Sequence, residues 1–143
     1  MKNYFSPKGS RFGIAPAFVG RVVTAALTAT GTDTLFIPRP NRLSRILGLS
    51  VSTDTVPVNA AANTAIFYKY DASADAAIAL CAATDLETLV TKEGRTVALL
   101  STLTDAQLML DDGDTLYVVT TQGGAQTTQP TNLYFAVELA VLE

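Results

Sequence analysis

The chain has 143 residues, of which 48% are apolar and 16% charged, and it contains no histidine, no tryptophan and one cysteine. This length fits one domain that buries roughly 70% of the surface exposed by its unfolded chain. The lack of histidine excludes Ser-His-Asp and Cys-His catalysis and imidazole metal sites, and one cysteine excludes an internal disulfide or a Cys-rich zinc site. Cys81 lies in the apolar run AAIALCAA, where we expect a buried structural thiol.

The first segment, MKNYFSPKGSRFGIAPAFVG, predicts an extended arm over residues 1–20. Glycines and prolines interrupt it too often for a helix, and it lacks the apolar run of a signal peptide, so we expect a protein that is made in the cytoplasm and stays soluble. Aromatic and arginine side chains are favoured anchors in interfaces. The candidate partner-binding residues of the arm are Lys2, Tyr4, Phe5, Lys8, Arg11 and Phe12.

Charge is distributed unevenly along the chain. Residues 1–45 carry seven basic residues and one acidic residue, a net charge of +6, whereas residues 46–143 carry three basic and twelve acidic residues, a net charge of −9. The basic segment predicts docking onto an acidic protein surface, with a solvated arm as the alternative. Nucleic acid fits less well, because the isoelectric point is about 4.8. A further alternative is that the arm packs on its own domain as an edge strand.

Residues 21–143 predict an all-β domain. Apolar residues alternate with others in NLYFAVELAVL (132–142), and β-branched and aromatic residues fill several other runs. The predicted strands are 18–27, 33–38, 44–52, 64–71, 76–81, 86–91, 95–100, 115–121 and 132–142. A helical turn is expected within residues 102–110 and a flexible loop at residues 121–130. Short strands separated by regular turn signals indicate an antiparallel two-sheet sandwich or a barrel.

The run LDDGDTLYVV (110–119) places Asp111, Asp112 and Asp114 around Gly113. This arrangement lacks the alternate spacing of a calcium-binding EF-hand loop, and adjacent residues of an extended chain point to opposite faces. Asp-Gly supplies the positive φ that a tight turn needs. We therefore expect a turn with hydrated acids before a strand, and no metal or other cofactor.

Two parts of the sequence resemble jelly-roll capsid decoration (cement) proteins of tailed bacteriophages. One is LMLDDGDTLYVVTTQGG with the closing TNLYFAVELAVL, and the other is LFIPRPNRLSRILGLSV with NTAIFYKYDASADAAIAL. In these proteins a Gly-Asp pair precedes the penultimate strand, as Gly113 and Asp114 do here. The resemblance covers residues 18–143. The long basic arm departs from the pattern and leaves the mode of attachment open.

The resemblance implies a jelly-roll sandwich without catalytic residues. It also implies a structural virion protein, a homotrimer that binds the major capsid protein on the outside of the shell and stabilises it. The apolar composition separately predicts a homo-oligomer, with a trimer ahead of a dimer. No nucleic acid or membrane partner is expected.

Other classes of protein stay open at this stage. One is a carbohydrate- or receptor-binding jelly roll that uses residues 121–130, although sugar sites commonly need aromatic stacking and few aromatic residues lie near this loop. Another is a neck or tail component of a virion. An enzyme such as a cupin or glycosidase fits poorly, because histidine is absent and the glutamates show no paired pattern.

Overall fold

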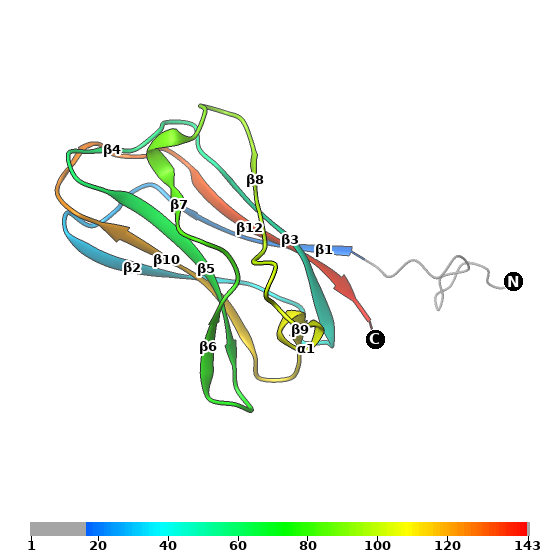
Figure 1. Ribbon diagram of the computed structural model, residues 1–143. Helices are drawn as coiled ribbons and strands as arrows, with labels where there is room; N and C mark the ends of the chain where they lie inside the picture. Colours follow the sequence, from blue (N-terminus) through cyan, green and yellow to red (C-terminus); the bar gives the residue numbers. More distant parts are fainter. Residues whose placement is uncertain (1–16, 143) are drawn as a thin grey trace, which may run out of the picture.

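Alternating apolar residues build two antiparallel sheets that share one interior (Figure 1). The computed structural model describes residues 17–142. In the strand Leu133–Val141 every second side chain is buried, from Leu133 to Val141, as the sequence pattern predicts. Phe135 meets Phe67 of the opposite sheet edge to face, with ring centroids 5.8 Å apart and an interplanar angle of 77°.

Each sheet has four main strands. The first sheet has the order β1 (Ala17–Thr24), β12 (Leu133–Val141), β3 (Ser44–Ser52) and β8 (Arg95–Val97), and β9 (Met109–Leu110) also pairs with β3. The second has the order β2 (Gly31–Ile37), β10 (Thr115–Gln122), β5 (Asn63–Asp71) and β6 (Ala76–Ala79), and β7 (Thr84–Asp85) also pairs with β5.

The order of these strands is that of a jelly roll. If β8 and β9 count as one interrupted strand, the main strands lie in the order first, eighth, third, sixth in one sheet and second, seventh, fourth, fifth in the other. All neighbouring pairs are antiparallel. Such an arrangement joins two Greek keys in a double-sheet sandwich. The predicted all-β sandwich is therefore confirmed.

Most predicted strands are present, but residues 86–91 were predicted wrongly. Leu86–Thr88 form the 3₁₀ turn η1, because the Asp85 carboxylate accepts a hydrogen bond from the Glu87 amide and caps the turn. Residues 121–130 are more ordered than the flexible loop we expected. β10 runs to Gln122, and β11 (Gln126–Thr128) pairs with β4 (Val58–Asn59).

The expected helical turn is confirmed as α1 (Asp105–Leu108). Thr104 and Gln107 form a capping box in which each side chain accepts a hydrogen bond from the backbone amide of the other. Within residues 17–142, no helix has the length and apolar character needed to cross a membrane.

The first strand begins earlier than the expected boundary between arm and domain. β1 starts at Ala17, so residues 17–20 belong to the first sheet, where Ala17 pairs with Ala140 of β12. A side chain at Gly20 would lie 2.1 Å from the Pro38 carbonyl oxygen, so only glycine fits this crossing of β1 past the end of β2. The remainder of the predicted arm, residues 1–16, lies outside the described residues.

One lysine lies in the interior of the sandwich. Lys69 of β5 is only 2% exposed, and its Nζ donates a hydrogen bond to the Met109 carbonyl at 2.6 Å. Its Nζ also lies 3.5 Å from Asp114 Oδ2 and 3.7 Å from Asp71 Oδ2. Because a buried ammonium group loses its hydration, these oxygens must replace the water that surrounds it in the unfolded chain.

Replacing Lys69 by methionine should strongly destabilise the protein. The Lys69→Met variant keeps much of the side-chain volume but leaves the Asp114 carboxylate buried without its cation. We expect the free energy of unfolding to fall by about 3–5 kcal/mol, the usual cost of breaking a buried pair. Urea denaturation followed by circular dichroism measures this change.

Lys92 provides a matched control, because its ion pair with Asp54 is on the surface. The Lys92 side chain is 72% exposed, and its Nζ lies 3.7 Å from Asp54 Oδ1. Lys92→Met should change stability by less than about 1 kcal/mol. Equal and small losses in the two variants would contradict the structural role of Lys69.

Candidate functional site

The acidic run before β10 forms a tight turn, as predicted. The Asp114 amide donates to the Asp111 carbonyl at 3.2 Å, and Gly113 has a φ of +89° that favours glycine. Asp111 and Asp112 are exposed, in agreement with the expectation of hydrated acids. The turn connects the end of β9 to the start of β10.

Asp114 differs from that expectation, because it is only 5% exposed. One carboxylate oxygen accepts from the Ala72 amide and the other from the Asp111 amide, both at 2.9 Å. The nearby Lys69 ammonium group supplies the opposite charge. Nothing in the local sequence predicts this burial, since Lys69 and Ala72 belong to β5 and the turn that follows it.

A second cation binds backbone carbonyls of the same turn. Arg39, in the connection between β2 and β3, donates from Nη1 to the carbonyls of Asp111 at 2.8 Å and Asp114 at 3.0 Å. Its Nη2 donates to the Arg42 carbonyl at 2.8 Å and makes a longer contact of 3.4 Å with the Leu110 carbonyl. The planar guanidinium group therefore fixes the β2–β3 connection against the acidic turn.

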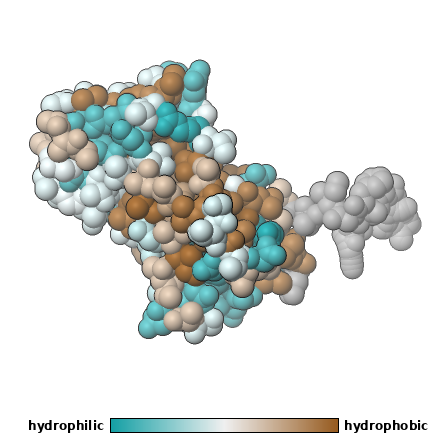
Figure 2. Space-filling model, in the orientation of Figure 1, coloured by the Kyte–Doolittle hydropathy of each residue, from teal (hydrophilic) through white to brown (hydrophobic). Residues whose placement is uncertain are grey.

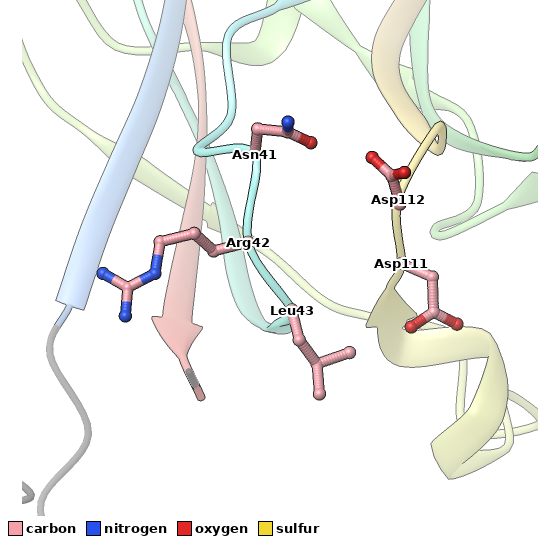
Figure 3. A pocket seen from close by; sticks show the side chains of 5 residues that line it. All are labelled: Asn41, Arg42, Leu43, Asp111 and Asp112. Atoms are coloured by element: carbon pink, nitrogen blue, oxygen red, sulfur yellow. The ribbon is translucent and has the colours of Figure 1, made fainter.

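An open depression lies between these two segments (Figure 3). It has a volume of about 440 Å³ and is lined by Asn41, Arg42, Leu43, Asp111 and Asp112. In Figure 3, Asn41 and Asp112 point toward each other, Asp111 points away, and Arg42 extends toward the start of β1. Its lining combines a guanidinium group, two carboxylates, an amide and one leucine side chain.

The two exposed acids of the turn do not converge on a common point in Figure 3, and the Asp114 carboxylate is already occupied by hydrogen bonds. In the part of the chain that the structure describes, no group of three or more His, Cys, Asp and Glu residues is placed to hold a metal ion.

The three arginines of the β2–β3 region differ in their surroundings. Arg39 donates hydrogen bonds to backbone carbonyls. Arg45 forms an ion pair with Asp105, with Nη2 lying 2.9 Å from Oδ1. Arg42 is exposed, and it forms no ion pair with any residue between 17 and 142. Of these three arginines, Arg42 is the one that is both exposed and without an ion pair among residues 17–142.

Polar side chains form a network at the other end of the sandwich. The amides of Asn63 and Gln126 exchange two hydrogen bonds, at 2.9 and 2.6 Å, and Asn63 also donates to Glu87 Oε2 at 3.2 Å. Asn59 donates to the Gly124 carbonyl at 2.5 Å. These hydrogen bonds order residues 121–130. They also occupy the side-chain amides of Asn63 and Gln126, which a polar ligand would otherwise bind.

Apolar side chains gather at the edge where the two sheets meet. Figure 2 shows them across the middle of the view, in the region where β5, β8 and α1 lie in Figure 1, with polar residues above and below. A shallow pocket of about 310 Å³ lies beside this region, between residues 82–85 and 95–98. Cys81 is buried nearby as expected, and its burial raises the pKa of the thiol, which opposes reactivity.

The candidate partner-binding residues of the arm, from Lys2 to Phe12, lie outside the described residues. The structure does fix the point at which the arm joins the domain. Ala17 pairs with Ala140, and the Leu142 amide donates to the Leu43 carbonyl, next to Arg42. β1 therefore begins at the end of the domain that carries the depression of Figure 3.

No protein-family model, curated protein or solved structure matches this chain.

Calcium should leave the stability of the protein unchanged. Asp114 is already neutralised by Lys69, and Asp111 and Asp112 point apart, so a cation gains no set of converging oxygens. Thermal unfolding midpoints with millimolar calcium and with a chelator should coincide. A midpoint several degrees higher with calcium would show that the folded acidic turn binds the ion.

Proposed function

We propose that the protein is a structural virion protein that binds the outer surface of a tailed-phage capsid and stabilises the shell as a decoration protein. The observation that carries the proposal is the position of Gly113 and Asp114 in a jelly roll. They directly precede β10, the penultimate main strand, as the Gly-Asp pair does in the decoration proteins that the sequence resembles. Fold alone does not define function, so the proposal depends on both the Gly-Asp pair and its position before β10.

The packing around Asp114 gives this motif a structural reason. Gly113 allows the turn, and the Asp114 carboxylate joins the turn to Ala72 and Lys69. A residue pair with this role supports a rigid scaffold and takes no part in chemistry. The proposal accordingly assigns no catalytic residue and no cofactor, and it places the protein on the virion after synthesis in the host cytoplasm.

Attachment is assigned to the arm. Lys2, Lys8 and Arg11 give it positive charge, and Tyr4, Phe5 and Phe12 provide apolar anchors. The major capsid protein is the proposed partner, with an acidic outer surface that attracts the arm over long range while the aromatic residues slow dissociation. Arg42, beside the point where the arm joins the domain, extends the same positive region.

The carbohydrate-binding alternative has less support. Its proposed loop, residues 121–130, contains no aromatic residue, and Gln126 is paired with Asn63. A sugar would have to displace these internal hydrogen bonds to use the amides. A neck or tail component would share both the scaffold and the arm, and it would differ in binding the neck or tail instead of the shell.

Removing residues 1–14 should abolish most shell binding while the domain still folds, since β1 begins at Ala17. Co-sedimentation with empty shells of the phage that carries the gene measures the loss. Within the full chain, Arg11→Glu should weaken binding more at low salt than at high salt. Lys92→Glu is the matched control, because the Lys92 amide donates to the Thr53 carbonyl beyond the end of β3, at the opposite end of the sheet from Ala17.

The truncated chain also decides where attachment lies. If it sediments with shells as completely as the full chain, the arm is not the attachment element, and Arg42 with its depression becomes the next site to alter. If neither protein binds shells but both bind isolated necks or tails, the decoration role is wrong.

A further inference from the structure

The central part of the outer side of the second sheet carries no charged side chain. Charges lie only at its edges, where Asp85 of β7 pairs with Thr64 of β5 and Asp75 accepts a hydrogen bond from the Tyr70 hydroxyl. The outward-facing side chains of β2, β10, β5 and β6 are threonines, alanines, aliphatic residues and aromatic residues, and none is ionisable at neutral pH. The charged residues of these strands, Asp33, Lys69 and Asp71, occupy the alternate positions that face the other sheet. We call this surface the uncharged face.

A row of three rings crosses the uncharged face. Phe36, Tyr117 and Tyr68 occupy paired positions on β2, β10 and β5. Tyr117 stacks on Tyr68 at a centroid distance of 5.3 Å and an angle of 12°, and it meets Phe36 at 5.7 Å and 48°. Phe36 remains 64% exposed at the end of the row. Burial raises the pKa of Tyr117, in keeping with its position between the two other rings.

This ring arrangement disfavours a sugar as the occupant. A carbohydrate stacks on the free face of an aromatic ring, but Tyr117 and Tyr68 already use a face of each ring on one another. Aromatic side chains such as tyrosine are enriched in protein–protein interfaces.

An uncharged surface suits a partner that is itself uncharged at the contact, and a second copy of the chain offers such a surface. Residues 17–142 contain seven basic and twelve acidic residues, a net charge of −5, so on average charge repels two copies that meet through other surfaces. The outer side of the first sheet carries Arg21, Arg45 and Glu138, whereas the uncharged face has charged side chains only at its edge, Asp75 and Asp85. Two copies can thus meet at the uncharged face without burying an unpaired charge.

The size of the face fits a weak but specific interface. β10 and β5 have eight and nine residues. β2 has seven residues and β6 four, so at about 3.3 Å per residue and about 4.8 Å between strands the four strands present roughly 440 Å² in projection. Two copies would then bury about 900 Å² in total, a size typical of weak, transient interfaces.

We propose that the uncharged face, centred on the row Phe36, Tyr117 and Tyr68, is the surface through which copies of this chain associate. Contact between two such faces gives a two-fold dimer, and contact of the face with another part of the next copy gives a ring such as a trimer. The proposal does not rest on the virion role, because association is a property of the isolated full chain.

Sedimentation velocity of the full chain tests the proposal. The mass should rise above the monomer value of 15.1 kDa as the concentration increases, over a range of about 1–100 µM that suits an interface of this size. Phe36→Glu places a charge in the contact and should weaken association by at least about tenfold. Thr34→Glu, on the same strand and face, should act in the same direction.

Val19→Glu is the matched control. Val19 is 59% exposed and lies on the edge strand β1 of the other sheet, so the change in exposure, strand position and charge resembles that of Phe36→Glu. Association of this variant should stay within about twofold of the unmodified chain. Circular dichroism spectra that match the unmodified chain establish that each variant is folded.

Two results would overturn the proposal. One is a monomer at all concentrations tested, and the other is equal association of Phe36→Glu, Thr34→Glu and Val19→Glu. Neither result bears on shell binding through the arm, which the truncated chain tests separately. A dimer or a trimer that the face variants dissociate would support the proposal, and its mass would give the mode of contact.

Discussion

The buried ammonium group of Lys69 is the constraint on which one end of the sandwich depends. It lies on β5 of the second sheet, yet it donates to the carbonyl of Met109 on β9, which pairs with the first sheet. It also lies beside the Asp114 carboxylate at the start of β10. Both sheets and the acidic turn thus contact one charged group. An apolar side chain in its place would leave the buried Asp114 carboxylate without a cation. The cost of removing this lysine from water is offset only when all of these oxygens are in place, so the pair makes the end of the fold specific.

Two cations stabilise the acidic turn that the sequence predicts. Lys69 neutralises Asp114 from inside, and Arg39 binds the carbonyls of the turn from outside. The Asp114 carboxylate is satisfied inside the domain, whereas Arg42, Asn41, Asp111 and Asp112 are exposed around an open depression. The strongest electrostatic interactions of the domain are satisfied internally. This is consistent with the proposed function, in which the protein binds through exposed surfaces and its N-terminal arm.

The long strands could be predicted from the sequence, because eight or nine residues of alternation leave little ambiguity about which face is buried. β5 and β12 are examples, and their pattern also predicts much of the core. β4, β7, β9 and β11 were missed, since two or three residues carry no measurable period. The 3₁₀ turn at residues 86–88 depends on one cap from Asp85, which outweighs the apolar content of the segment. The burial of Asp114 and the row of rings depend on strand pairing, so neither could be predicted from local sequence.

The proposed arm and the proposed uncharged face would reinforce each other. A single arm of modest charge binds an acidic surface weakly, and an interface of about 900 Å² also binds weakly. When copies associate, however, their arms act together, and the second arm binds at a high effective concentration set by the distance between the arms. The reverse also holds, because arms bound to neighbouring positions on a shell bring uncharged faces close together. Since the arm joins the domain at the ends of β1 and β12, and the uncharged face belongs to the other sheet, neither contact has to displace the other. Shell binding should therefore promote association even at concentrations at which the free protein is mainly monomeric.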